Sequence, residues 1–278
     1  MLVWQRQEVQ ALPRELSDST KLAGEERILD WEGALNARDT GGLPTADGGH
    51  IRPAALVRSD VLTRLTPSGR AALVAHGVRT IVDVRSAEEL ARDVDYPFRD
   101  SQVAGDPAYI NVSFVVDLTE DEDARLRSVR NTTWRLGELN RADIDVHRAG
   151  VGAIARAVAD ARPGGVLIHC HAGKDRTGLS VGILLSLAGV ADDEIADDYA
   201  LTMLAYEKLI EEWIGNVEES DRERMRELAK PTREAMLEML EHVKTTYGGA
   251  EPYLLGTGVS PEQIARIRER LVERSNAA

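Results

Sequence analysis

Cysteine and long apolar runs are scarce in this sequence, and each shortage excludes a class of protein. The 278 residues contain one cysteine, so a framework of intrachain disulfides is excluded. No apolar run approaches the ~20 residues that a membrane-spanning helix needs, and the N-terminus lacks the basic-then-apolar pattern of a signal peptide. The sequence therefore predicts no stable membrane insertion and a cytoplasmic location by default, although export without a leader would leave no mark on it.

Positive charge is also in short supply. There are 34 Lys and Arg residues against 47 Asp and Glu residues, which gives a formal net charge of −13. Such a balance argues against nucleic acid as a partner, although a local basic mouth could still attract an anion. A hydrophobic content of 43% and a charged content of 29% are typical of globular proteins.

The single cysteine lies in the most informative stretch, residues 166–178, which reads VLIHCHAGKDRTG. The apolar start predicts a buried strand, and the apolar run from Leu179 predicts a helix. A loop between a strand and a helix can curl its N–H groups inward around a phosphate, with the helix N-terminus adding positive charge. Arg176 can grip two phosphate oxygens with its planar fork. The predicted phosphate-binding residues are His171, Ala172, Gly173, Lys174, Asp175 and Arg176.

The same surroundings predict a reactive sulfur. A helix N-terminus and nearby cations can lower the pKa of a cysteine thiol from ~8.5 to roughly 3.5–7.5, and a thiolate is a strong nucleophile. The sequence therefore predicts that Cys170 forms a cysteinyl-phosphate. The hydroxyl of Thr177 is placed to hydrogen-bond the sulfur and to help its departure.

Other readings of the stretch fit less well. A P-loop NTPase is excluded because Asp175 follows the loop lysine where Ser or Thr is needed, and Ile168 stands where the first glycine belongs. A zinc site is disfavoured because residues 169–171 are adjacent and no second cysteine exists. The sequence therefore predicts neither a metal nor a cofactor.

Residues 169–178 resemble the signature loop of the cysteine-dependent protein tyrosine phosphatases. The Gly-Lys-Asp-Arg-Thr-Gly ending is similar to a bacterial branch of that family, the protein tyrosine phosphatase B branch of mycobacteria. The segments 36–42 (Asn-x-Arg-Asp-x-Gly-Gly) and 56–60 fit the same branch. The resemblance implies metal-independent hydrolysis of phosphotyrosine, with phosphoserine, phosphothreonine or phosphoinositides as further substrates. Inorganic phosphate would be a product or an inhibitor.

The general acid is the weakest point of the resemblance. The Trp-Pro-Asp segment that usually carries it is missing. Asp175, in the loop, is the preferred candidate. Asp83 is the alternative, because it ends a predicted strand at 80–84, where ligands bind in open α/β sheets. A structural ion pair of Asp83 with Arg85 or Arg58 is an equal possibility.

Two cations have open roles. Arg58 either forms a structural ion pair with Asp60 or lies near the pocket. Lys174 either supplies charge for a multiply phosphorylated inositol ring or is a solvated lysine on the rim. Both are therefore candidate rim residues.

Strands that alternate with helices predict an α/β fold, with a central, mostly parallel sheet flanked by helices and right-handed crossovers. We expect an N-terminal arm over residues 1–26 and a single phosphatase domain over 27–275. Residues 206–247 mix apolar side chains, among them Leu209 and Trp213, with many charges. They are interpreted either as a helical lid over the pocket or as a bundle packed on the sheet. The stretch 192–213 is predicted to form one long helix.

Two rival functions remain at this point. A non-catalytic phosphate-binding module would use the same cradle, and a sulfurtransferase also uses a loop cysteine. The Arg176-Thr177 ending disfavours the sulfurtransferase, and the presence of nucleophile, arginine and acid disfavours the inactive module.

Overall fold

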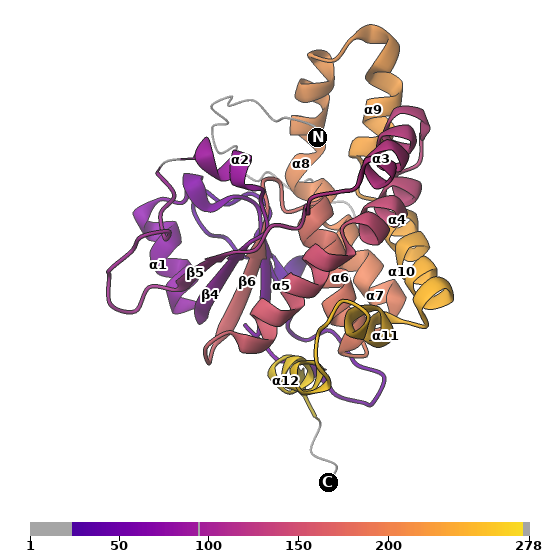
Figure 1. Cartoon of the computed structure of the whole chain (residues 1–278). Helices are drawn as coiled ribbons and strands as arrows, with labels where there is room; N and C mark the ends of the chain where they lie inside the picture. Colours follow the sequence, from indigo (N-terminus) through magenta and orange to yellow (C-terminus); the bar gives the residue numbers. More distant parts are fainter. Residues whose placement is uncertain (1–23, 94, 275–278) are drawn as a thin grey trace.

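The computed structural model describes residues 24–93 and 95–274, and it is built around a five-stranded sheet (Figure 1). The strand order is β1-β3-β6-β4-β5. Neighbours from β3 to β5 run parallel, and β1 is antiparallel to β3. The predicted mostly parallel sheet is therefore confirmed. The strands are β1 (Arg38–Asp39), β3 (Leu56–Ser59), β6 (Gly165–His169), β4 (Val78–Asp83) and β5 (Ala108–Asn111). Most of the predicted N-terminal arm, residues 1–23, lies outside the described residues.

The register of the central strands brings three chain segments to one edge. Ser59 of β3 and Asp83 of β4 both pair with His169 of β6. The carboxyl ends of three parallel strands are thus level, and Cys170 follows directly. Polar side chains far apart in the sequence meet here for that reason.

Helices cover both faces of the sheet. Along β6, Val166 and Ile168 pack into the core with α5 (Arg148–Asp160) and α6 (Asp175–Leu187), whereas Leu167 packs into the core with α1 (Pro67–Ala75). This alternation is the period-two pattern of a strand, and because both faces are buried the strand reads as a continuous apolar run.

The predicted helix starts are confirmed where a side-chain cap was expected. Thr66 caps α1, and complete capping boxes begin at Ser86 and Ser260. The further elements are α2 (Ala87–Ala91), α3 (Glu120–Thr132), α4 (Leu136–Val146), α7 (Asp192–Ala200), α8 (Thr202–Gly215), α9 (Arg222–Ala229), α10 (Arg233–Tyr247), α11 (Ala250–Leu255), α12 (Pro261–Leu271) and the two-stranded sheet of β2 (His50–Ile51) with β7 (Val272–Glu273).

The single long helix expected over 192–213 is wrong. The chain breaks at Leu201, between α7 and α8. The carbonyl of Asp198 would accept a bond from the amide of Thr202 in a continuous helix. It accepts instead from Nη2 of Arg38 at 2.7 Å, and the same nitrogen donates to the Thr202 hydroxyl at 3.1 Å. A buried guanidinium from β1 thus takes the place of a helical hydrogen bond.

The segment 206–247, interpreted either as a lid or as a bundle packed on the sheet, is divided in two. The helices α8 and α9 form a hairpin that rises above the end of the sheet (Figure 1). Its apolar contacts form a separate small cluster around Tyr206, Ile210 and Ile214. The helix α10 packs instead into the main core through Met236 and Met239. The side chains of Leu209 and Trp213 lie outside the described part of the chain. None of the described helices is long and apolar enough to cross a membrane.

Candidate active site

The loop after β6 turns its carbonyl groups outward. Five consecutive carbonyl oxygens, those of residues 170–174, accept hydrogen bonds of 2.8–3.0 Å. The donors are His169 Nδ1 for Cys170, the Val61 amide for His171, Asn36 Nδ2 for Ala172, Arg58 Nη2 for Gly173 and the Gly178 amide for Lys174. The N–H of a peptide unit points away from its carbonyl, so the loop amides are turned to the inside of the curl. Backbone donors in this arrangement form an anion cradle.

One loop residue has to be glycine. Gly173 has a φ of +65°, in the left-handed region that favours glycine. A Cβ at this position would lie 2.4 Å from the carbonyl oxygen of Ser59. The tight seating of the loop on β3 therefore depends on the missing side chain.

The guanidinium of Arg176 is held by Glu89 of α2. Nη1 and Nη2 donate to the two carboxylate oxygens at 2.5 and 2.9 Å. Glu89 also accepts from the Ser86 amide at 3.0 Å as part of the capping box. Burial opposes the charge of Arg176, but nearby Cys170 and Glu89 raise its pKa. The carboxylate thus has the two-oxygen geometry that a phosphate would present to the same fork.

Sequence reasoning missed the contact of Glu89 with the loop arginine. The capping box identified it only as the third residue of a helix. No sequence pattern paired it with Arg176, 87 residues away.

A buried ion cluster supports the loop from below. Arg58 Nη1 donates to Asp198 Oδ2 at 2.8 Å, and Arg38 Nε donates to Asp198 Oδ1 at 3.1 Å. All three residues are at most 1% exposed. Burial alone would raise the pKa of Asp198, but Arg38 and Arg58 hold it at about 2. Because Arg58 also binds the carbonyl of Gly173, the cluster fixes the loop's position.

Of the two roles left open for Arg58, the ion pair with Asp60 does not form, and Arg58 instead binds Asp198 and the carbonyl of Gly173 in the loop. Asp60 binds Arg64 at 2.5 Å and accepts from the backbone amides of Leu35 and Asn36 at 3.0 Å. Adjacent strand residues point to opposite faces, and Ser59 alone separates the two positions, so strand geometry does not forbid the pair. The partner of Arg58 is instead Asp198 of α7, which binds its guanidinium.

Asp83 lies beneath the loop in a network of its own. Its oxygens accept from Arg85 Nε and Nη2, at 3.0 and 2.7 Å, and from the Tyr109 hydroxyl at 2.9 Å. Burial would raise the pKa of Asp83, but His169 and Arg85 lower it. The residue is fully buried. The structural pair with Arg85 is the one that forms, and the pair with Arg58 does not.

Asp175 is the first residue of α6 and, unlike Asp83, is partly exposed. Its side chain is 40% exposed, and Oδ1 lies 2.7 Å from Nζ of Lys174. The Tyr199 hydroxyl donates to the same oxygen at 3.4 Å. Asp175 therefore combines access to solvent with a place in the loop.

Lys174 is not the solvated rim lysine of one expectation. Its side chain is 11% exposed. Besides Asp175, Nζ binds the carbonyl of Leu228 in α9 at 3.4 Å. The lysine thus links the loop to the α8–α9 hairpin.

The hydroxyl of Thr177 is buried, and no hydrogen-bond partner for it occurs within residues 24–93 and 95–274. Cys170 is 3% exposed. The Thr177 hydroxyl lies in the first turn of α6, seven residues after Cys170. Its lack of another partner is consistent with the expected hydrogen bond to the Cys170 thiolate.

Comparison with known proteins agrees with this geometry. A model of a tyrosine phosphatase family matches residues 29–273. The chain belongs to this family. It is 32% identical over 224 residues to a tyrosine-protein phosphatase of Nostoc commune, covering 78% of this chain and 74% of that protein. It is 29% identical over 280 residues to the triple specificity protein phosphatase PtpB of Mycobacterium tuberculosis, covering 87% and 98%. The predicted relationship and the predicted phosphatase activity are therefore confirmed.

The α8–α9 hairpin lies against the signature loop of this phosphatase. Ala172 packs on the cluster of Tyr206, Ile210 and Ile214. Burial is the main cause that raises the pKa of Tyr206, and Cys170 is among the charges that act on it. The hairpin therefore contacts the loop at Ala172 and, through the carbonyl of Leu228, at Lys174.

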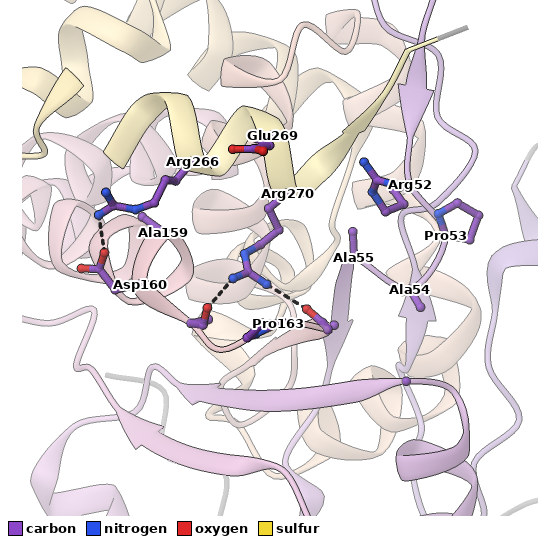
Figure 2. Close-up of a pocket in the computed structure, with 14 residues that line it drawn as sticks. Arg52, Pro53, Ala54, Ala55, Ala159, Asp160, Pro163, Arg266, Glu269 and Arg270 are labelled. Carbon is purple, nitrogen blue, oxygen red and sulfur yellow. Dashed lines mark hydrogen bonds and ion pairs between the residues drawn. The ribbon is translucent and has the colours of Figure 1, made fainter. Parts of the chain in front are cut away.

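The large hollow in Figure 2 belongs to another part of the phosphatase. It has a volume of about 700 Å³ and is lined by Gly77 and Gly165, at the amino ends of β4 and β6. Its arginines are already bound. Arg266 pairs with Asp160 at 2.5 Å, and Arg270 donates to backbone carbonyls that include Gly164 at 2.8 Å. The hollow thus lies at the end of the strands opposite to Cys170.

Proposed function

We propose that this phosphatase hydrolyses phosphomonoesters of proteins, phosphotyrosine foremost, through a cysteinyl-phosphate. The observation that supports it most is the signature loop. The carbonyls of residues 170–174 all accept hydrogen bonds from groups outside the phosphate cradle, which leaves the loop amides facing inward. Arg176 follows the loop in the first turn of α6. Such a cradle stabilises the charge on the equatorial phosphate oxygens as it develops.

The first chemical step is an in-line displacement. The Cys170 thiolate attacks phosphorus, an S–P bond forms and the bond from phosphorus to the leaving oxygen breaks. Asp175 gives its proton to that oxygen, so the product leaves as a neutral phenol or alcohol. Arg176 exchanges the carboxylate of Glu89 for two phosphate oxygens.

The second step regenerates the enzyme. Water attacks phosphorus and gives a proton to Asp175, while the S–P bond breaks. The Thr177 hydroxyl stabilises the departing thiolate with a hydrogen bond. Inorganic phosphate is released and, because it fits the same cradle, also inhibits.

Substrate choice follows the charge around the loop. The Mycobacterium tuberculosis relative is named a triple specificity phosphatase, which supports phosphoserine and phosphothreonine as further substrates. Lys174 lies in the loop and becomes available to a second phosphate, as on a phosphoinositide, once its ammonium leaves Asp175 and the carbonyl of Leu228. Turnover rates on a panel of phosphopeptides and phosphoinositides would rank these substrate classes.

We also retain the expectation of a cytoplasmic location for this phosphatase.

Turnover of p-nitrophenyl phosphate tests the proposal. The wild-type protein should release nitrophenol, and Cys170→Ser should release none while it still binds phosphate through the loop amides and Arg176. Retained turnover in Cys170→Ser would contradict the covalent route. Phosphate binding without any turnover in the wild-type protein would favour the non-catalytic module instead.

A further inference from the structure

One peptide unit of the signature loop, the one between Ala172 and Gly173, can turn over without strain. A peptide unit is planar and turns as a whole, so a half-turn reverses its carbonyl and its N–H and carries φ of the next residue to the opposite sign. Gly173 has a φ of +65°, and glycine adopts negative φ values equally well. The other loop residues carry side chains and have negative φ, so a half-turn of the unit before any of them would impose a strained positive φ.

The direction of this unit decides what the cradle offers to an anion. In the structure the carbonyl of Ala172 lies outside the curl, and the N–H of Gly173 is turned inward. Among the hydrogen bonds within the described residues, none is donated by this N–H, so it is available to a phosphate oxygen. After a half-turn the cradle would present a carbonyl oxygen, which repels a phosphate, in place of a donor. The loop thus needs a group that holds the unit in one direction.

The side chain of Asn36 is that group. Asn36 is 4% exposed and opens the Asn-x-Arg-Asp segment, whose role the sequence left open. Its Nδ2 donates to the carbonyl of Ala172 at 3.0 Å, and its Oδ1 accepts from Nη1 of Arg38 at 2.5 Å. Its backbone amide is fixed by Oδ1 of Asp60 at 3.0 Å. The side chain must therefore both donate and accept, which a carboxamide does.

Arg38 keeps the carboxamide of Asn36 from turning over. The guanidinium has donors only, and it is held by Asp198 Oδ1 and by the Thr202 hydroxyl, each at 3.1 Å. A turned carboxamide would set its nitrogen against these donors and its oxygen against the carbonyl of Ala172. Both contacts are buried, so losing them would be costly. Asn36 thus has one orientation, and it is the one that ties the carbonyl of Ala172 outward.

We propose that Asn36 is a positioning residue that holds this peptide unit in one direction, so that the N–H of Gly173 faces the phosphate oxygens. The inference rests on the proposed function. Asn36 touches neither the substrate nor the sulfur, and it acts through the Gly173 amide. A donor that is oriented before the substrate arrives needs no reorganisation when charge develops on the phosphoryl oxygens.

Asn36→Asp separates the two halves of the contact. A carboxylate has nearly the same shape, keeps an oxygen for Arg38 and loses the donor for Ala172. The variant should therefore unfold in urea like the wild type, while its carboxylate faces the carbonyl of Ala172 and favours the flipped unit. We expect turnover of p-nitrophenyl phosphate to fall ~10²–10³-fold, as on removal of one oxyanion donor. The Kd of inorganic phosphate, measured by calorimetry, should rise.

Asn36→Ala tests whether the added charge explains the loss. This variant removes the donor and adds no carboxylate, so its phosphate affinity should fall as well. A direct readout is the amide resonance of Gly173 in protein made with isotope-labelled glycine. Inorganic phosphate should shift this resonance in the wild-type protein, because the N–H binds a phosphate oxygen, and should not shift it in either variant.

Thr202→Val is the matched control. The Thr202 hydroxyl accepts from the same guanidinium as Asn36, and within the described residues no hydrogen bond joins it to the signature loop. Its replacement should lower the free energy of unfolding and leave the phosphate affinity and the Gly173 shift as in the wild type. Impaired phosphate binding in Thr202→Val would point to a general loosening around Arg38 and overturn the specific role of Asn36.

Wild-type phosphate affinity in both Asn36 variants, or a Gly173 shift that persists in them, would also overturn this role. An impaired Asn36→Asp beside a normal Asn36→Ala would assign the effect to charge and overturn it too. If Asn36→Ala does not fold, the Gly173 resonance of Asn36→Asp decides. Failure of the proposed function looks different: a wild-type protein that binds phosphate, shifts the Gly173 resonance and releases no nitrophenol would refute hydrolysis and leave the role of Asn36 standing.

Discussion

Replacing Asp198 by Asn should both destabilise the protein and disturb its signature loop. The carboxylate is the shared partner of Arg38 and Arg58, and all three are buried. The change keeps the size of the side chain and removes the charge. Two buried guanidinium groups then lose their anion, which is the costly way to break a buried pair.

The magnitude follows from the pKa. Asp198 has a pKa of about 2 in the folded protein against an ordinary value of 3.8. That difference corresponds to about 2 kcal/mol of stability. Removing one partner of a buried ion pair typically costs about 3–5 kcal/mol. We therefore expect Asp198→Asn to lower the free energy of unfolding by about 3 kcal/mol.

The pH dependence has a definite sign. Because the folded pKa lies below the unfolded value, the stabilisation is complete above the unfolded pKa of 3.8 and is lost as the pH falls through the folded value of about 2. The difference between wild type and variant should thus be equal at pH 7 and pH 5. It should shrink only below about pH 4.

Urea unfolding at these pH values is the assay, and Asp197→Asn is the matched control. Asp197 is the neighbouring residue of α7, is 37% exposed and pairs with Arg233 on the surface. Its replacement should cost less than about 1 kcal/mol. A loss below about 1 kcal/mol in Asp198→Asn, or a difference already halved at pH 5, would refute the reasoning. The folded fraction of Asp198→Asn should also lose phosphatase activity, because Arg58 no longer holds Gly173.

Three further predictions concern the site itself. Arg176→Ala should weaken phosphate binding, measured by calorimetry, as well as turnover; unchanged binding would mean that the loop amides suffice. Asp175→Asn should slow a phosphotyrosine peptide by ~10²–10⁴-fold and p-nitrophenyl phosphate far less, whereas Asp83→Asn should mainly lower stability; the reverse outcome would exchange their roles. Deleting about residues 215–230 should leave a folded protein in which Cys170 is alkylated and oxidised faster and small aryl phosphates are hydrolysed at least as well; unchanged thiol reactivity would exclude a lid.

The sequence by itself determined the features that form between residues close together in the chain. A strand, a loop with one cysteine and a helix occupy consecutive residues in 166–187, so their order follows from apolar patterning. The capping boxes at Ser86 and Ser260 need only residues three apart. The alternation of strands and helices was enough to predict the parallel sheet. The family resemblance rested on the same short segments.

Tertiary structure alone decided which acidic side chain pairs with which arginine. Glu89 reaches Arg176 across 87 residues, and Asp198 reaches Arg58 across 140. Which acid meets which arginine depends on how helices dock on the sheet. No local pattern records that docking. The pairing of Arg58 with Asp198 in place of Asp60 and the helix break at Leu201 have the same cause. A buried charge pairs with whichever partner the packed fold brings to it, because an unpaired charge is too costly to bury.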